Sequence, residues 1–258
     1  VIAAQLAGSV PPAIPGLDEV DYLTNVGVLD LDTVPEHLVI IGGSYIGLEF
    51  AQMYRRFGAQ VTVVERGQRL ASREDDDVCA AIKDILEKDG ITIHLGADDI
   101  RVAKDGAGVA VHTSASGPTV TGSHLLVAVG RRPNTDDLGL DLAGVELDQH
   151  GYIVTDDQLR TTAEHIWAMG DSNGKGAFTH TSYNDFEIVA ANLLDDEPRK
   201  VSDRIPTYAL YSDTPLGRAG MSEAQVRQSG RKALVGKRPM TRVGRAVEKG
   251  ETQGFMKV

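Results

Sequence analysis

The first half of the chain alternates short apolar runs with segments of helical periodicity. Residues 38–41 form a continuous, β-branched run that ends in two glycines, which predicts a parallel strand buried on both faces. Apolar residues then recur at helical spacing over 45–57 and stop at Gly58, so we expect a helix there. A second apolar run over 61–65 predicts the strand that completes a βαβ unit.

The alternation continues with a helix predicted over 75–89, a strand over 91–95, a meander around 106–108 and a buried strand over 125–129. The helix begins with an acidic run at 74–77. We attribute this run to the favourable interaction of carboxylates with the positive end of a helix dipole. Strands that alternate with helices predict an α/β protein with a doubly wound, Rossmann-like sheet.

The second half has a different pattern. We expect strands over 151–155 and 166–169 and an apolar-faced helix over 186–194. Further strands are predicted over 208–211 and 232–235, on either side of a short helix that starts at Ser222. The capping box that Ser222 forms with Gln225 is typical of a helix start.

Composition excludes several classes of protein. The 258 residues carry 37 acidic and 26 basic side chains, a formal net charge of -11, so a broad cationic nucleic-acid surface is not expected. No apolar run approaches the roughly 20 residues of a membrane helix. Cys79 is the single cysteine, which excludes a disulfide framework and a cysteine-rich metal site. The histidines show no ligand spacing, and we expect no metal site.

A glycine-rich turn is the sharpest local motif. Gly42 would make a tight turn between strand and helix, and Gly47 would allow the helix to pack closely on the strand. Ser44 stands where the G-x-G-x-x-G fingerprint has its middle glycine. Because the turn precedes a helix N-terminus, it predicts a site for a dinucleotide pyrophosphate; a purely structural turn is the alternative.

Glu65 ends the second strand, 18 positions beyond Gly47. An acid near this offset accepts hydrogen bonds from the adenosine ribose hydroxyls and repels a 2′-phosphate, which favours NAD. Arg66 and Arg69 follow directly and could instead bind that phosphate, so NADP remains open; both arginines could also be merely solvated.

Two further motifs follow the glycine-rich turn at 42–49, namely 129–134 (VGRRPN) and 166–171 (IWAMGD). In this order and spacing the three motifs resemble the flavoprotein pyridine nucleotide-disulfide oxidoreductases. The stretch 178–185 (FTHTSYND) is most similar to the mercuric-reductase-like branch of that family. The resemblance covers nearly the whole chain.

The resemblance implies four segments: a connector over 1–34, an NAD(P)-binding domain over 35–133, a second FAD-domain segment over 134–204, and the start of a dimerisation domain over 205–258. It implies FAD and NAD or NADP as cofactors, a homodimer, and a small-molecule or metal-ion electron acceptor such as a disulfide or Hg(II). The family's redox cysteine pair and first FAD fingerprint are expected upstream, and its catalytic His-Glu pair downstream. The chain is therefore expected to be a central fragment of a cytoplasmic enzyme.

The resemblance also assigns residue roles. Gly130 would lie beside NAD(P)H and Asp171 would bind the FAD ribityl or pyrophosphate region. Tyr45 would be a movable lid over the flavin at the nicotinamide site, with Glu49 near the nicotinamide. The N–H groups over 177–180 would face the flavin carbonyl edge; a lone His180 is more often a cap or a packed residue. We expect no catalytic residue among the 258 residues. We expect cofactor contacts from Gly42, Gly43, Ser44, Tyr45, Ile46, Gly47, Glu49, Glu65, Arg66, Val129, Gly130, Gly170, Asp171, Ala177, Phe178, Thr179 and His180.

Two other functions remain open at this point. The chain could belong to a catalytically silent NAD(H)-binding module without flavin. It could also come from a flavin reductase that has no cysteine pair and passes electrons to a partner or to oxygen. An upstream G-x-G-x-x-G and an upstream cysteine pair in the parent chain would distinguish these from a disulfide oxidoreductase.

Overall fold

The computed structural model describes residues 7–9 and 13–258. The chain divides into two compact units, one built from 1–10 and 130–208 and the other from 11–129 and 209–258. Each unit has its own hydrophobic clusters. Among the residues described, no helix has both the length and the apolar character needed to cross a bilayer.

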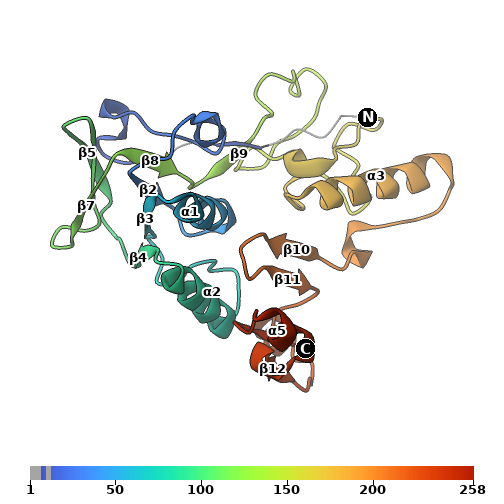
Figure 1. Cartoon of the computed structure of the whole chain (residues 1–258). Helices are drawn as coiled ribbons and strands as arrows, with labels where there is room; N and C mark the ends of the chain where they lie inside the picture. Colours follow the sequence, from blue (N-terminus) through green and yellow to red (C-terminus); the bar gives the residue numbers. More distant parts are fainter. Residues whose placement is uncertain (1–6, 10–12) are drawn as a thin grey trace. The chain divides into compact units, whose positions relative to one another are not determined.

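The larger unit is built on a parallel sheet with the strand order β4-β3-β2-β8 (Figure 1). The inner strand β2 is apolar and buried from Leu38 to Ile41, as the continuous run at 38–41 predicts. Two helices, α1 and α2, pack against one face of this sheet. The elements are β2 (His37–Ile41), α1 (Tyr45–Phe57), β3 (Gln60–Val64), α2 (Asp76–Lys88), β4 (Thr92–His94) and β8 (His124–Val127).

Alternate residues of β2 serve different hydrophobic clusters. Leu38 and Ile40 pack with residues of α1 and α2, whereas Val39 and Ile41 pack with an antiparallel sheet on the opposite face. That second sheet is the predicted meander. It consists of β5 (Arg101–Asp105), β6 (Gly108–His112) and β7 (Thr119–Gly122). The parallel sheet is therefore covered on both sides, and the α/β fold class is confirmed.

The segment 209–258 belongs to the same unit and contributes Leu210, fully buried, to the cluster around α1 and α2. Its short elements are β11 (Leu216–Ala219), α4 (Glu223–Gln228), β12 (Lys237–Pro239), α5 (Gly244–Lys249) and β13 (Phe255–Lys257), after β10 (Thr207–Leu210) has led into it. The capping box predicted at Ser222 and Gln225 is present, with both reciprocal hydrogen bonds formed.

The smaller unit has little regular structure besides one long helix. It contains β1 (Ala7–Ser9), which pairs with β9 (Arg131–Pro133), and α3 (Thr179–Leu194). Two small hydrophobic clusters form its core, one around Ile153 and the other around Leu159. The 3-10 helices of both units are η1 (Leu17–Glu19), η2 (Gly27–Asp30), η3 (Gly170–Asn173), η4 (Val201–Asp203) and η5 (Met240–Arg242).

Three predicted strands are wrong. The stretches 151–155 and 166–169 form only isolated bridges, Leu147 with Ile153 and Arg160 with Trp167, because no continuous ladder runs beside them in the described part of the chain. The strand predicted over 232–235 lies instead at β12, where backbone pairing with β13 selects it. The apolar run misled the prediction, since Leu234 is fully exposed. The helix predicted over 186–194 begins earlier, at Thr179.

Candidate functional site

The strand order places a switch point between β2 and β8. The chain winds outward from β2 through β3 to β4 and then returns to the other side of β2 with β8. Ligands of open α/β sheets bind outside the carboxyl ends of the strands at such a point. The residues that follow those two ends are Gly42 and Ala128, and their proximity is direct: a Cβ on Gly42 would lie 2.6 Å from the Ala128 carbonyl oxygen.

Glycine is required at two positions of this turn. Gly42 has φ +119°, a conformation that side-chain-bearing residues rarely adopt. A Cβ on Gly47 would lie 2.1 Å from the Gly42 carbonyl oxygen, so a side chain there would push α1 away from β2. The prediction that Gly47 allows close helix–strand packing is therefore supported by the geometry.

The N-terminus of α1 faces the turn without a side-chain cap. Ser44 is the N-cap residue, has an extended backbone, and its exposed hydroxyl makes no capping bond. The first N–H groups of a helix have no partner within the helix. Together with the helix dipole they make an anion site of the kind that a pyrophosphate occupies. The turn and α1 thus fit a dinucleotide, with Tyr45 and Ile46 in the first turn.

Glu65 closes the turn from the neighbouring strand. Its Oε2 accepts a hydrogen bond from the Gly43 N–H at 2.6 Å, and its Oε1 accepts one from the Gly67 N–H at 2.6 Å. Each glycine permits this approach, because an added Cβ would lie 3.0 Å from the carboxylate in both cases. The carboxylate is half-buried and keeps acceptor capacity on each oxygen. Two backbone N–H groups therefore hold this carboxylate in one position at the end of β3.

The two arginines after Glu65 differ in their surroundings. Arg66 is exposed. Arg69 forms an ion pair with Asp76 at the start of α2. Both partners of this ion pair are exposed, so the pair contributes little, and the guanidinium keeps further N–H donors.

The side chains of Tyr45 and Glu49 contact other protein groups. The Tyr45 hydroxyl donates a hydrogen bond of 2.7 Å to Glu74 Oε1. Glu49 Oε1 accepts a hydrogen bond of 2.8 Å from the backbone N–H of Tyr211. One turn further along α1, the buried Gln52 side chain bonds both the N–H and the C=O of Asp213. The outer face of α1 thus binds the backbone of the segment 209–258.

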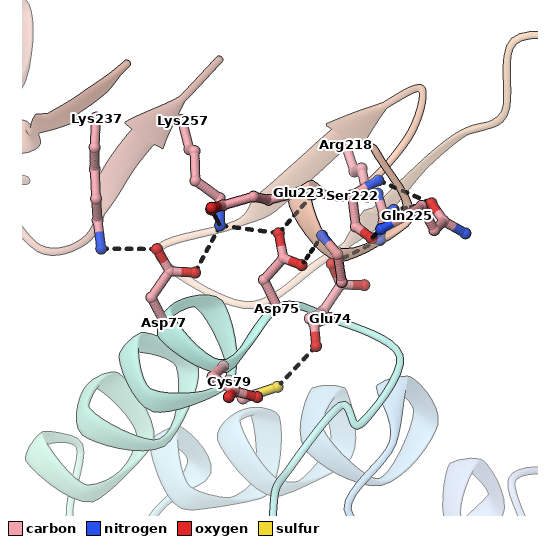
Figure 2. Close-up of polar contacts among 12 residues, drawn as sticks. Glu74, Asp75, Asp77, Cys79, Arg218, Ser222, Glu223, Gln225, Lys237 and Lys257 are labelled. Atoms are coloured by element: carbon pink, nitrogen blue, oxygen red, sulfur yellow. Dashed lines mark hydrogen bonds and ion pairs between the residues drawn. The ribbon is translucent and has the colours of Figure 1, made fainter. Parts of the chain in front are cut away.

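The acidic run at 74–77, where α2 begins, has partners that a helix dipole does not supply (Figure 2). Glu74 pairs with Arg218 at 3.1 Å, and its side chain is 3% exposed. Asp75 accepts hydrogen bonds from the first two N–H groups of α4 and pairs with Lys257. Asp77 pairs with Lys237 and Lys257. The dipole explanation was incomplete: three of these four acids bind the segment 209–258.

A second group of predicted residues lies in the smaller unit. Gly170 has φ +78° and its N–H donates to Asp185 Oδ2 at 2.8 Å. Asp171 is 5% exposed, with Arg131 Nη2 at 3.5 Å from its Oδ2. Asp185 is 1% exposed and also binds Asn173 and Arg204. The sequence pattern indicated Asp171, but the supporting role of Asp185 was missed.

The start of α3 carries the remaining candidates. Ala177, Thr179 and His180 are exposed, and the N-cap residue Phe178 makes no side-chain cap. The Phe178 ring stacks on those of His180 and Tyr208, at centroid distances of 5.4 and 5.7 Å. His180 Nε2 lies 2.6 Å from the Thr207 carbonyl oxygen, so this nitrogen carries a proton. The uncapped N–H groups of α3 fit an anionic or carbonyl group of a bound cofactor.

The structure therefore gathers the predicted residues into two sets. In the larger unit the nucleotide set follows β2, β3 and β8 and comprises Gly42, Gly43, Ser44, Tyr45, Ile46, Gly47, Glu49, Glu65, Arg66 and Val129. The smaller unit holds Gly130, Gly170, Asp171, Ala177, Phe178, Thr179 and His180. Among the residues described, no group of three or more His, Cys, Asp or Glu side chains is arranged to hold a metal ion.

Comparison with known proteins agrees with this geometry. The sequence profile of the family described as "Pyridine nucleotide-disulphide oxidoreductase" matches residues 1–185, and the profile of the dimerisation domain of that family matches 206–258. The chain belongs to the pyridine nucleotide-disulphide oxidoreductase family. The resemblance inferred from the three sequence motifs is confirmed, and the chain contains part of the dimerisation domain.

The curated relatives are named for several different activities. The chain is 38% identical over 255 residues to a mercuric reductase of Streptomyces lividans, covering 97% of this chain and 54% of that protein. It is 39% identical over 254 residues to the probable pyridine nucleotide-disulfide oxidoreductase RclA of Escherichia coli strain K12, covering 97% and 57%. It is 35% identical over 260 residues to a dihydrolipoyl dehydrogenase of Haloarcula marismortui, covering 97% and 54%. The chain spans about half the length of these curated relatives.

Solved structures give the same result. The structure of the HOCl-induced flavoprotein disulfide reductase RclA from Escherichia coli matches with a TM-score of 0.90 and 38% identity, covering 98% of this chain and 58% of that one. A Cu(II) complex of RclA matches with the same TM-score and coverage.

Proposed function

We propose that this chain is the nucleotide-binding centre of an FAD-dependent oxidoreductase that oxidises NAD(P)H. The family implies FAD and NAD(P)H. A bound flavin would supply hydride acceptance from the nicotinamide and two-electron transfer to an acceptor. In this chain the turn at 42–47 would bind the pyrophosphate, and Glu65 would hold the adenosine ribose.

The observation that carries the proposal is the fixed position of Glu65. Its carboxylate is hydrogen-bonded to Gly43 in the pyrophosphate turn and to Gly67 beyond its own strand. A ribose that binds there meets a preorganised acceptor rather than a mobile side chain. Since a carboxylate at this position would repel a 2′-phosphate, we propose NADH as the preferred donor over NADPH.

Residues of the smaller unit would bind part of the FAD. The buried carboxylate of Asp171 follows a turn that Asp185 holds in place, and both side chains are nearly inaccessible to solvent. The uncapped start of α3, with Ala177, Phe178 and Thr179, would place N–H groups against the flavin carbonyl edge. We assign His180 a structural part, because its Nε2 bonds the Thr207 carbonyl.

We propose that the acceptor is a disulfide or a metal ion such as Hg(II). The relatives that are named mercuric reductase, dihydrolipoyl dehydrogenase and flavoprotein disulfide reductase support this range. The chain holds one cysteine, Cys79, which is buried, so a redox dithiol would come from elsewhere in the protein. The segments 35–133, 134–204 and 205–258 keep their proposed roles in nucleotide binding, FAD binding and homodimer formation, and cytoplasmic location remains a prediction.

The test is a visible absorption spectrum of the full-length protein, recorded without oxygen before and after the addition of NADH. Flavin bands that bleach on addition support the proposal. A colourless protein that still binds NADH would support a nucleotide-binding module without flavin and would overturn the proposed reaction. A yellow protein whose bands do not change with NADH or NADPH would also overturn it.

A further inference from the structure

One buried carboxylate touches both the nucleotide turn and the segment 209–258. Glu74 Oε1 accepts the hydrogen bond of Tyr45, the first residue of α1, and its Oε2 lies 3.1 Å from Arg218 Nη1. Residue Glu74 is 6% exposed, and the Arg218 side chain is 13% exposed. Interactions between charges are stronger at such buried positions than at the surface. A shift of Arg218 therefore changes the acceptor that Tyr45 depends on.

The position of Arg218 is itself fixed by the segment 209–258. Arg218 Nη2 donates a hydrogen bond of 2.9 Å to Gln225 Oε1. The same oxygen accepts a hydrogen bond from the Ser222 N–H, which closes the capping box of α4 (Figure 2). Asp75, which follows Glu74, accepts hydrogen bonds from the first two N–H groups of α4. Arg218 is thus held by the same elements that attach α4 to the start of α2.

Additional contacts tie this segment to α1. The Tyr211 N–H bonds Glu49, four residues after Tyr45, and the Asp213 backbone bonds Gln52. Tyr45, Glu49 and Gln52 lie on one face of α1, since residues three or four apart are neighbours on a helix. The helix that carries the pyrophosphate turn is therefore also the surface on which the segment 209–258 is seated.

We propose that Arg218 is a positioning residue for the nucleotide site: through Glu74 it holds the Tyr45 side chain where the nicotinamide half of the dinucleotide binds well. This inference rests on the proposed function, because it requires a dinucleotide at the N-terminus of α1, and on the place beside the nicotinamide that the family resemblance implies for Tyr45. Coupling between two sites is reciprocal, so a bound nucleotide also stabilises the attachment of 216–225 to residues 74 and 75.

The test compares NAD⁺ with ADP-ribose, which lacks the nicotinamide, by calorimetric titration of the full-length protein. Arg218→Gln and Tyr45→Phe are each expected to raise the Kd for NAD⁺ roughly five- to tenfold, and the double variant no more than either single one, because both remove the same link. The Kd for ADP-ribose stays within about twofold. Arg218→Lys, which keeps the charge beside Glu74, restores most of the NAD⁺ affinity.

Arg227→Gln is the matched control, because it removes an arginine of α4 that pairs with Glu223 at the surface. Its Kd for NAD⁺ should equal that of the wild type. If Arg218→Gln does not fold, the double variant Glu74→Gln/Arg218→Gln removes both buried charges together and is expected to give the same loss of NAD⁺ affinity.

Three results would overturn the coupling: an unchanged Kd for NAD⁺ in Arg218→Gln, fully additive effects of Arg218→Gln and Tyr45→Phe, or an equal loss of ADP-ribose binding. In each of these the wild type still binds NAD⁺, so the proposed function survives. A wild-type protein that binds neither NAD⁺ nor ADP-ribose overturns the proposed function itself.

Discussion

The α-carbon of Gly47 faces the carbonyl oxygen of Gly42 so closely that an added Cβ would stand 2.1 Å from that oxygen. This close approach sets the distance between α1 and β2, and with it the position of the uncapped helix N-terminus. The turn at 42–47 is therefore defined by a backbone contact that a side chain at position 47 would disrupt.

Gly47→Ala is expected to lower the free energy of unfolding by about 1–3 kcal/mol, since an extra methyl group in a packed contact forces the backbone to move. NADH binding should weaken as well, because the N–H groups of α1 leave their positions. Chemical denaturation and NADH titration of the full-length protein measure the two effects. Gly244→Ala is the control, as its Cβ would enter open space. Equal behaviour of the two variants would contradict the role of Gly47.

Glu65→Ala is expected to shift cofactor preference from NADH toward NADPH. The variant loses charge-assisted hydrogen bonds to the ribose, worth about 1.5–3 kcal/mol, and loses the repulsion of a 2′-phosphate. The ratio of kcat/KM for NADH to that for NADPH should therefore fall roughly tenfold or more. Lys104→Ala, at an exposed position of β5 outside the nucleotide set, is the comparison and should leave the ratio of kcat/KM for NADH to that for NADPH unchanged. An unaltered ratio in Glu65→Ala would remove the ribose assignment.

The contacts of Lys257 predict a dependence on pH. Burial acts to raise the pKa of both Asp75 and Asp77, but hydrogen bonds outweigh this effect. Asp75 accepts hydrogen bonds from Lys257 and from the first N–H groups of α4, and Asp77 accepts them from Lys237 and Lys257. The pKa of each carboxyl therefore lies below the ordinary 3.8. Burial acts to lower the pKa of Lys257, and Asp77 and Asp75 outweigh it and raise that pKa.

A lowered carboxyl pKa gives stability that is present above the ordinary value and is lost as the pH falls through the folded value. A raised lysine pKa gives stability that is present below the ordinary 10.5 and is lost only at higher pH. Attachment of the strands at 237–239 and 255–257 should thus be constant through neutral pH and weaken below pH 3.8.

Hydrogen exchange of the 255–257 amides, corrected for intrinsic rates, measures this attachment. At neutral pH Asp77→Asn should speed exchange by roughly fivefold, equivalent to about 1 kcal/mol. Glu251→Gln removes an exposed pair with Lys249 and should have no effect. Exchange that is indifferent to both Asp77→Asn and acid would contradict the role of Lys257.

Cys79 is expected to react slowly with thiol reagents in the folded protein. The residue is 3% exposed, and burial raises the pKa of its thiol, so the reactive thiolate is scarce at neutral pH. Mass spectrometry of the Cys79 peptide after a short exposure to iodoacetamide should find it unmodified, and after unfolding fully modified. Rapid alkylation of the folded protein would show that this thiol is available for redox chemistry.

The local pattern of the sequence determined the nucleotide-binding half of the molecule. The helix predicted over 45–57 and the strands around 38–41 and 61–65 lie where expected, because burial on both faces leaves a continuous apolar signal in each strand. The turn at Gly42 and the acid at Glu65 were also visible, since both are required by local backbone geometry and fixed spacing.

Only the tertiary structure decided what the acidic run at 74–77 does. Acidic residues are common at the start of any helix, so the run by itself indicates no partner. Its partners Arg218, Lys237 and Lys257 lie more than 140 residues away in the sequence. Ion pairs of this kind depend on where separate segments meet, which no local pattern records. The same reason explains why a strand forms at 237–239 and not at the predicted 232–235. The stretch 232–235 had the stronger local apolar pattern, but the backbone of 237–239 is the one that pairs with 255–257.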